Sequence, residues 1–488
     1  MSEKLRVKLL KTGVPGLDAI LGAGLPELSF NIIGGAPGSG KTTFAQQIMF
    51  SLATPTSKAL FFTAMGEPPV KMLRYQQQFG FFDFDKVDGS IEFINLAQEV
   101  EQGNYDVVLA QILEAVRTHS PAYVFIDSFR SFVQGAKGEH KEIQALQSFV
   151  QQLVTHMTGW RATTFLIGEY LANEADQNPI FTVADGIIWL NQCVQRNAMV
   201  RKVQVIKMRG QAQRPGMHTF RITEAGIEIF PRMIGAAEPT GSEAPAPAPA
   251  SARRLSMGVP ELDDMLGGGV PLGYSMLLVG PSGSGKSTLA TEFVAEGVRQ
   301  GENCVIALFE KSPSQMMNDK LGALVRSGKV AMLNVRTLDL SIDETLHELV
   351  MLIDKTKASR VVLDSLSAFE LALAPEFRED FRESLFRLTT VLTEKGVTLL
   401  MTAELEDRFT ELRFSPNGSA FLVDAIVMLR YIETEAEIRT LISVIKVRGS
   451  AHSREFRLFE IGPDSVAIGA RPAPYAGILG GSPGTIAS

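Results

Sequence analysis

The chain has little cysteine, no excess of positive charge and no long apolar run. Its two cysteines, Cys193 and Cys304, cannot build a disulfide framework or a four-cysteine zinc site, so we expect a reducing, cytoplasmic location. Lys and Arg number 47 against 54 Asp and Glu, and the net charge of −7 excludes a basic nucleic-acid footprint over the whole chain. Because no signal-like apolar core opens the sequence and no run of roughly 18 apolar residues follows, we expect neither secretion nor a transmembrane helix.

The rest of the composition is that of a globular protein. Hydrophobic residues make up 45% and charged residues 21%, which argues against a disordered or fibrous chain. A length of 488 residues corresponds to about three domains of typical size, or to two large ones.

An internal repeat favours two large domains. Residues 12–18 read Thr-Gly-Val-Pro-Gly-Leu-Asp, and residues 257–263, 245 positions later, read Met-Gly-Val-Pro-Glu-Leu-Asp. Near the end of each copy, Lys-Met-Arg-Gly at 207–210 is matched by Lys-Val-Arg-Gly at 446–449, now 239 positions later. A repeat of this length is a duplicated domain with small deletions in the second copy, and not a solenoid unit.

Alternating Pro and Ala residues separate the two copies and predict an extended linker, because Pro fits neither a helix interior nor a sheet ladder. The end of the chain is rich in Gly, Pro and Ala, which is typical of a poorly ordered tail. We therefore predict an N-terminal domain at 1–235, a linker at 236–252, a C-terminal domain at 253–461 and a flexible tail at 462–488.

Short apolar runs alternate with longer amphipathic segments in each copy. This alternation predicts an α/β fold, in which a mostly parallel sheet is covered by helices on both faces. The strands expected in the first copy are 30–33, 59–63, 123–126, 164–167 and 186–190, and the clearest helices are 109–116 and 143–154.

Each copy contains the phosphate-loop pattern Gly-x4-Gly-Lys-Thr/Ser, at 35–42 and at 280–287. Each match follows an apolar strand (30–33 and 276–279) and opens a helix (43–50 and 288–294), which is the context that the motif requires. Glycines let backbone N–H groups curl around phosphates, and the helix N-terminus adds a positive dipole. The predicted nucleotide-binding residues are Gly35, Gly38, Ser39, Gly40, Lys41, Thr42 and Thr43 in the first copy, and Gly280, Gly283, Ser284, Gly285, Lys286, Ser287 and Thr288 in the second.

Within these loops the side chains have separate roles. Lys41 and Lys286 are expected to reach the β- and γ-phosphates of a nucleoside triphosphate, and Thr42 and Ser287 to hold Mg²⁺. The alternative is that each loop is only a tight glycine turn, but two matches in register argue strongly against an accident.

A buried strand ends in Asp-Ser in each copy, at Asp127 and at Asp364. An Asp at this point can hold the water shell of Mg²⁺ beside the phosphate loop, although an Asp after a strand is commonly only a turn residue. The phosphate loops upstream favour the metal role.

A carboxylate that orients the attacking water is expected after the strand that follows the phosphate-loop helix. The second copy has Glu310 there, also a candidate Mg²⁺ ligand, whereas the repeat spacing places Met65 at the same position of the first copy. Glu67 is two positions further on and could substitute only if its loop shifts. The alternative for Glu310 is a surface helix cap.

Together these motifs resemble the KaiC family of RecA-type ATPases, over nearly the whole chain. The resemblance is carried by the Gly-Val-Pro-x-Leu-Asp motifs, both phosphate loops, both Asp-Ser strand ends and both Lys-x-Arg-Gly segments. Gly-Gly-Gly-Val-Pro-Leu-Gly at 267–273 and the ending at 480–486 add to it.

The resemblance implies ATP and Mg²⁺ as cofactors and a two-tier homohexamer with nucleotide between neighbouring subunits. It also implies that a Lys-x-Arg pair reaches the γ-phosphate across the subunit interface, where a cation would neutralise charge on the transferring phosphoryl group. In this chain the pairs are Lys207 with Arg209, and Lys446 with Arg448. The alternative is a basic pair on a solvated strand edge.

The chain departs from the circadian clock members of that family in three places. It has Met65-Gly66 and Glu310-Lys311 where clock members carry paired glutamates. It has Ala420 and Phe421 at the clock phosphorylation sites, although Ser415 and Ser419 are nearby. In the first copy, residues 25–29 lack the usual Gly before the first core strand, so we expect a distorted approach to that strand.

We predict a hexameric KaiC-type ATPase that couples nucleotide state to a protein signalling partner. The alternative is an ATP-dependent Ser/Thr autokinase of the clock type. A RecA-like, DNA-associated ATPase is disfavoured by the acidic balance and by the lack of a basic segment interleaved with aromatics. Neither nucleic acid nor membrane is expected as a partner.

Overall fold

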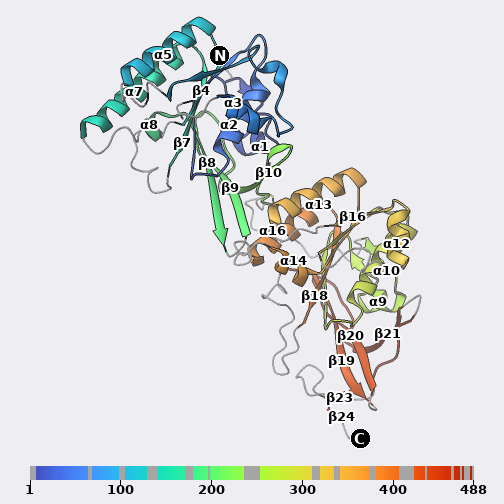
Figure 1. Cartoon of the computed structure of the whole chain (residues 1–488). Helices are drawn as coiled ribbons and strands as arrows, with labels where there is room; N and C mark the ends of the chain where they lie inside the picture. Colours follow the sequence, from blue (N-terminus) through green and yellow to red (C-terminus); the bar gives the residue numbers. More distant parts are fainter. Residues whose placement is uncertain are drawn as a thin grey trace, which may run out of the picture. The chain divides into compact units, whose positions relative to one another are not determined.

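Each copy of the repeat is built on one sheet, which has nine strands among the described residues (Figure 1). The computed structural model divides into two compact units, Met1–Arg232 and Met233–Ser488. It describes residues 7–63, 69–97, 100, 105–128, 140–170, 180–195, 198–235, 253–309, 319–334, 341–373, 381–405, 422–434, 437–462, 466–472, 475–476 and 484–485.

The first sheet has the strand order β11-β10-β9-β8-β3-β7-β6-β4-β5. From β8 to β5 all strands are parallel, and β9 to β11 continue the sheet antiparallel. The strands are β3 (Phe30–Gly35), β4 (Ala59–Thr63), β5 (Ile91–Asn95), β6 (Tyr123–Asp127), β7 (Thr163–Glu169), β8 (Gly186–Gln195), β9 (Ala198–Met208), β10 (Met217–Thr223) and β11 (Gly226–Phe230), with a separate pair β1 (Leu9–Leu10) and β2 (Leu25–Pro26). The helices are α1 (Leu17–Leu21), α2 (Lys41–Leu52), α3 (Pro69–Gln76), α5 (Tyr105–His119), α7 (His140–Gly159) and α8 (Ile180–Val183), with a 3-10 turn at Phe84–Lys86.

The second sheet repeats this arrangement in the order β16-β15-β17-β18-β14-β19-β20-β21-β22. Its strands are β14 (Ser275–Gly280), β15 (Cys304–Leu308), β16 (Val330–Asn334), β17 (Arg360–Asp364), β18 (Thr398–Glu404), β19 (Ala425–Thr434), β20 (Glu437–Val447), β21 (Arg457–Ile461) and β22 (Val466–Ile468), with the short strands β12 (Arg254–Leu255), β13 (Val270–Pro271), β23 (Tyr475–Ala476) and β24 (Gly484–Thr485). The helices are α9 (Pro260–Met265), α10 (Lys286–Arg299), α12 (Asp319–Arg326), α13 (Ile342–Thr356), α14 (Leu366–Ala372) and α16 (Phe381–Glu394).

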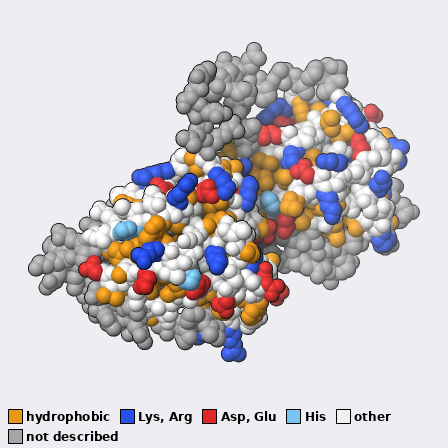
Figure 2. All heavy atoms as spheres, turned by 90° about the horizontal axis from the view of Figure 1, so that it is seen from above, with side chains coloured by type: hydrophobic (Ala, Val, Ile, Leu, Met, Phe, Trp, Pro, Cys, Tyr) orange, Lys and Arg blue, Asp and Glu red, His pale blue; other side chains and the backbone are white. Residues whose placement is uncertain are grey.

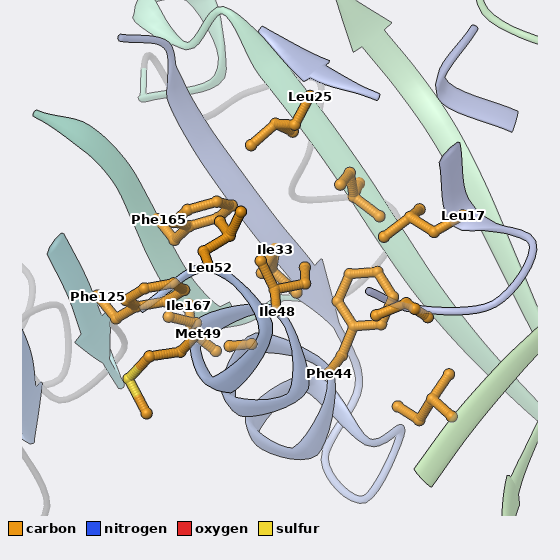
Figure 3. Packing of buried hydrophobic residues seen from close by; sticks show 14 of the residues in the cluster. Leu17, Leu25, Ile33, Phe44, Ile48, Met49, Leu52, Phe125, Phe165 and Ile167 are labelled. Atoms are coloured by element: carbon orange, nitrogen blue, oxygen red, sulfur yellow. The ribbon is translucent and has the colours of Figure 1, made fainter. Parts of the chain in front are cut away.

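Helices cover both faces of each sheet, as the alternating pattern predicted. On one face of the first sheet, Phe44, Ile48 and Met49 of α2 pack against Phe125 and Phe165 of the strands (Figure 3). On the other face, α5 and α7 pack against the alternate side chains of the same strands (Figure 1). The fold prediction of two tandem α/β domains is therefore confirmed.

The repeated Gly-Val-Pro-x-Leu-Asp motif closes a loop in each copy. Asp18 accepts hydrogen bonds from the backbone N–H of Thr12 at 3.1 Å and from its hydroxyl at 2.7 Å. Asp263 accepts from the N–H of Met257 at 2.7 Å and from the Ser256 hydroxyl. The motif is therefore structural, because its Asp fixes the turn that leads into α1 or α9.

The approach to the first core strand is not distorted, in contrast to the expectation from residues 25–29. Leu28 takes the position of Gly273 and adopts the same left-handed backbone, with φ of 64° against 79°. The N–H of Leu28 donates to the Thr163 hydroxyl at 2.8 Å, and the N–H of Gly273 donates to the Thr398 hydroxyl at 2.9 Å. The fold imposes this geometry even where the residue is unfavourable.

Part of the segment expected as a flexible tail belongs to the second sheet. β22 pairs with β21, and Ile468 lies buried in the core beside α10. Two apolar residues in a Gly- and Pro-rich stretch gave too weak a pattern for a strand to be predicted. Within the described part of the chain, no helix is long and apolar enough to cross a membrane.

Candidate functional site

The first phosphate loop leaves the carboxyl end of β3 and runs directly into α2. Three of its glycines have positive φ: Gly35 at 148°, Gly38 at 73° and Gly40 at 96°. The Lys41 side chain is 6% exposed, and its ammonium donates to the carbonyl of Ala36 at 2.8 Å. The lysine therefore folds back over the loop, where it faces any anion that the loop encloses.

The second loop, between β14 and α10, resembles the first at its last two glycines and its lysine. Gly283 and Gly285 have φ of 78° and 100°. Lys286 is 7% exposed and donates to the carbonyls of Gly280 at 2.9 Å and Pro281 at 2.7 Å. In both loops the last two glycines are thus left-handed and the lysine folds back onto the loop.

Polar groups in the loops are arranged to receive phosphate. The hydroxyls of Ser39 and Ser284 are buried and lack a hydrogen-bond partner among the described residues. A side chain at Gly38 would meet nothing within 4 Å, so the loop leaves open space there. The N–H groups in the first turn of α2 and α10, including those of Thr43 and Thr288, have no partner inside the helix. These features fit the phosphates of a nucleotide.

A hydroxyl and a carboxylate meet beside the first loop. The Thr42 hydroxyl donates to a carboxylate oxygen of Asp127 at 2.6 Å. Burial raises the pKa of the Asp127 carboxyl from 3.8 to about 6; the Thr42 hydrogen bond and the charge of Lys41 oppose this shift, and the charge of Glu169 adds to it. A buried carboxylate next to a hydroxyl is a donor set that suits Mg²⁺, and the cation would offset the burial.

The corresponding carboxylate of the second copy has a different neighbour. Asp364 is 4% exposed and accepts a hydrogen bond from the hydroxyl of Thr402 on the adjacent strand β18. The first copy has Ile167 at that position, level with Asp127. Ser287, the predicted hydroxyl ligand, is exposed at the start of α10. The oxygen donors for Mg²⁺ are present in both copies, but they are held differently.

The basic pair of each copy lies near the amino-terminal ends of the parallel strands, whereas the phosphate loop extends from their carboxyl ends. Met208 pairs with Gly186, which is level with Asn31 near the start of β3, whereas the loop leaves β3 at Gly35. Each residue advances a strand by about 3.3 Å, so roughly 10 Å or more along the strands separates the basic pair from the phosphate loop. The second copy is arranged alike, because Val447 is level with Met276.

A β-bulge and a carboxylate fix the basic pair of the first copy. The pairing of β8 with β9 shifts at Lys207, which leaves one extra residue in β9. Arg209 donates to Asp185 at 3.1 Å, and Asp185 also accepts from the N–H of Phe30 at 3.0 Å. Lys207 donates to the carbonyl of Thr182 at 3.1 Å, and burial together with the charge of Arg209 lowers its pKa below 10.5.

The second copy repeats the bulge, at Lys446. Arg448 donates to Asp424 at 3.3 Å, and Asp424 accepts from the N–H of Ser275 at 3.0 Å. Lys446 donates to the carbonyl of Val423 at 2.6 Å, and burial with the charge of Arg448 lowers its pKa. In both copies the arginine of the pair is therefore held beside a carboxylate.

One carboxylate in each copy was not predicted from the sequence. Glu169 ends β7 and is level with Gly35, and Glu404 ends β18 and is level with Gly280, so each lies beside the first glycine of a phosphate loop. A Glu at the end of an apolar strand looks like a solvated terminus. Only the strand order, which places β7 next to β3, could have drawn attention to it.

Several predicted residues lie outside the described part of the chain. In the first copy these are Met65, Gly66 and Glu67. In the second copy they are the candidate catalytic carboxylate Glu310, its neighbour Lys311, and Ser415, Ser419, Ala420 and Phe421 at and near the clock phosphorylation sites.

The chain is similar to known proteins over nearly its whole length. The family described as "ATPase: KaiC" matches residues 10–234 and 255–473. The circadian clock protein KaiC3 of a Synechocystis species is 27% identical over 499 residues, covering 98% of this chain and 95% of that protein. The circadian clock oscillator proteins KaiC of Parathermosynechococcus lividus and of a Picosynechococcus species are 26% and 27% identical; the matches cover 99% of this chain and 89% and 93% of theirs.

Proposed function

The chain belongs to the KaiC family of ATPases, and from this premise we propose that it works as a nucleotide-dependent homohexamer with two tiers of ATP sites. One observation carries the proposal. In each copy the phosphate loop and the Lys-x-Arg pair lie at opposite ends of the strands of the same sheet. A site that uses both features needs two chains, and a head-to-tail contact of this kind must close into a ring to fill every site.

Within each proposed site the residues divide the work. Lys41 or Lys286 binds the β- and γ-phosphates, together with the N–H groups of the loop. Arg209 or Arg448 of the neighbouring subunit neutralises the charge that develops on the transferring phosphoryl group. These contacts stabilise the charge distribution of the reaction and require little covalent chemistry from the protein.

Mg²⁺ fits the same sites. Thr42 and Asp127 would hold it in the first copy, and Ser287 and Asp364 in the second. When bound, the ion neutralises phosphate charge and polarises the phosphoryl oxygens. Without it, the buried Asp127 carboxylate remains unfavourable, as its raised pKa indicates.

We also propose that nucleotide state is passed on to a protein partner and not to a nucleic acid. On the face shown in Figure 2, basic and acidic side chains of the described residues are interspersed. This arrangement does not favour the continuous electrostatic attraction that nucleic-acid binding needs.

Light scattering in the presence of ATP and Mg²⁺ tests the assembly. We expect a hexamer for the unmodified chain and weaker assembly for Lys41→Ala than for Lys286→Ala, because in the family that the chain resembles the first ring holds the hexamer. Exchange of an exposed lysine in the last turn of α13, Lys355→Ala, is the control and should assemble normally. A stable monomer in saturating ATP and Mg²⁺ would contradict the proposal.

A further inference from the structure

Glu169 and Glu404 are fixed beside the phosphate loops by backbone hydrogen bonds. The N–H that follows each Glu donates to the first glycine of the neighbouring loop: Tyr170 to Gly35 at 3.2 Å, and Leu405 to Gly280 at 3.1 Å. The ends of β7 and β18 are therefore tied to the loops, and each Glu keeps its position when the loop is ordered.

Both glutamates lie on the sheet face that carries the Mg²⁺ carboxylate. Ile167 is level with Asp127 on the neighbouring strand, and side chains level with each other in a sheet share a face. Glu169 is two residues beyond Ile167 and returns to that face. This is the face covered by α2, because Phe165 and Ile167 pack with Phe44 and Ile48 (Figure 3).

In the second copy a hydrogen bond supports the same assignment. The hydroxyl of Thr402 reaches Asp364, so the two side chains share a face, and Glu404 is two residues beyond Thr402. The N–H of Glu404 donates to the Ser367 hydroxyl at 3.1 Å, which holds the strand end in place. Glu169 is half-buried and Glu404 is exposed at the open side of the loop.

We propose that Glu169 and Glu404 make ATP binding conditional on a divalent cation. Each places a second carboxylate at the edge of the sheet from which the phosphate loop and the Mg²⁺ carboxylate extend. A carboxylate there repels the γ-phosphate when no cation is present, and it accepts hydrogen bonds from the water shell of Mg²⁺ when the ion is bound. The inference rests on the proposed nucleotide sites and assigns their preference for the metal-bound nucleotide to these two residues.

The first copy can be tested alone in a full-length chain that also carries Lys286→Ala. Calorimetry would measure binding of the β,γ-imido analogue of ATP in Mg²⁺ and in EDTA, and the readout is the ratio of the two affinities. For Glu169→Gln we expect this ratio to fall about tenfold, mainly because binding in EDTA becomes tighter when the like charge is removed. Glu114→Gln, on α5 across the sheet, is the matched control and should leave the ratio unchanged.

The outcomes are distinguishable. If Glu169→Gln weakens binding equally in Mg²⁺ and in EDTA, the residue is only structural and the inference is overturned. If the parent chain binds no nucleotide under either condition, the proposed function itself fails. For the second copy, adding Glu404→Gln to Glu169→Gln with both loops intact should lower the ratio at both classes of site; a ratio that stays high at one class would overturn the assignment of Glu404.

Discussion

At the scale of single residues, Leu28 shows how strongly the fold imposes a backbone conformation. Only glycine adopts left-handed φ without steric cost, and for an L-residue the conformation costs about 1–2 kcal/mol. The second copy avoids the cost with Gly273, whereas the first copy does not. Leu28 is 37% exposed, so its side chain offers little burial in compensation.

Leu28→Gly should therefore stabilise the first copy. We expect the free energy of unfolding to rise by about 0.5–1 kcal/mol, since the relieved strain exceeds the extra entropy that glycine gives the unfolded chain. Urea unfolding monitored by fluorescence would measure it, because both tryptophans, Trp160 and Trp189, lie in the first copy. Gly273→Leu should destabilise the second copy, and a loss of stability in Leu28→Gly would contradict the argument.

Asp127 is the second residue that lowers the stability of the fold, because its carboxylate is buried. Its pKa is about 6 when folded and about 3.8 when unfolded, so the folded chain binds more protons between these values. Stability must then fall as the pH rises from about 4 to about 6 and stay lower above that range. This is the opposite of a carboxylate stabilised by an ion pair.

Asp127→Asn should remove this pH dependence. At pH 7 in EDTA we expect the free energy of unfolding to rise by up to about 3 kcal/mol, because each tenfold change in proton affinity corresponds to roughly 1.4 kcal/mol. Denaturant unfolding at pH 5 and pH 7 would measure the effect. The same variant should lose the stabilisation that Mg²⁺ and nucleotide give to the unmodified chain; equal pH slopes in both chains would refute the buried-carboxylate explanation.

At the scale of elements, one buried arginine links β17 to α10 and to two loop residues in the second copy. Arg360, at the start of β17, is 0% exposed and donates to Glu302 at 2.6 Å, to the carbonyl of Ser256 at 2.7 Å and to that of Phe293 in α10 at 2.9 Å. Gly297, near the C-terminal end of α10, makes room, because a Cβ there would lie 2.7 Å from the Arg360 side chain. The first copy has Tyr123 at this position.

Arg360→Ala should destabilise the second copy by roughly 3–5 kcal/mol, since it removes the buried donor to a mostly buried carboxylate and to two carbonyls. The matched control is Arg253→Ala, because Arg253 contacts the same Glu302 at 3.3 Å but is 68% exposed, and its loss should cost less than about 1 kcal/mol. Thermal unfolding would compare them. Similar costs for the two variants would show that burial does not decide the energy.

Most of the parallel half of the first sheet could be predicted from sequence, whereas its outer strand β5 and the antiparallel half could not. Buried strands such as β4 and β6 are continuous apolar runs, and the predicted ranges fall on them with at most small extensions. The strands β9 to β11 mix polar with apolar residues, so their hydrophobic pattern is weak.

The site was likewise only partly predictable. The phosphate loops and the Asp-Ser strand ends were found because their chemistry is encoded in local spacing. The hydrogen bond from Thr402 to Asp364, and the place of Glu169 beside Gly35, depend on which strands are neighbours. Neighbours in a sheet with crossovers are far apart in sequence, so no local pattern reveals them.

At the scale of the whole molecule, the two copies should differ in turnover. Glu310 is the carboxylate expected to orient water in the second copy, and Met65 stands in its place in the first. We expect Glu310→Gln to lose nearly all ATP hydrolysis, by about 10²–10⁴-fold at that site, and Glu67→Gln to change little. Phosphate release measures both. Loss of turnover in Glu67→Gln instead would mean that Glu67 serves the first copy.

The separation of each phosphate loop from its own Lys-x-Arg pair also has a genetic consequence. In the proposed ring, a chain with Lys286→Ala and a chain with Arg448→Ala spoil opposite sides of the second-copy sites. Each is inactive alone, but random mixing in equal amounts would restore about a quarter of those sites, because an intact loop then meets an intact arginine. Two recessive defects in this protein would thus complement each other within one gene.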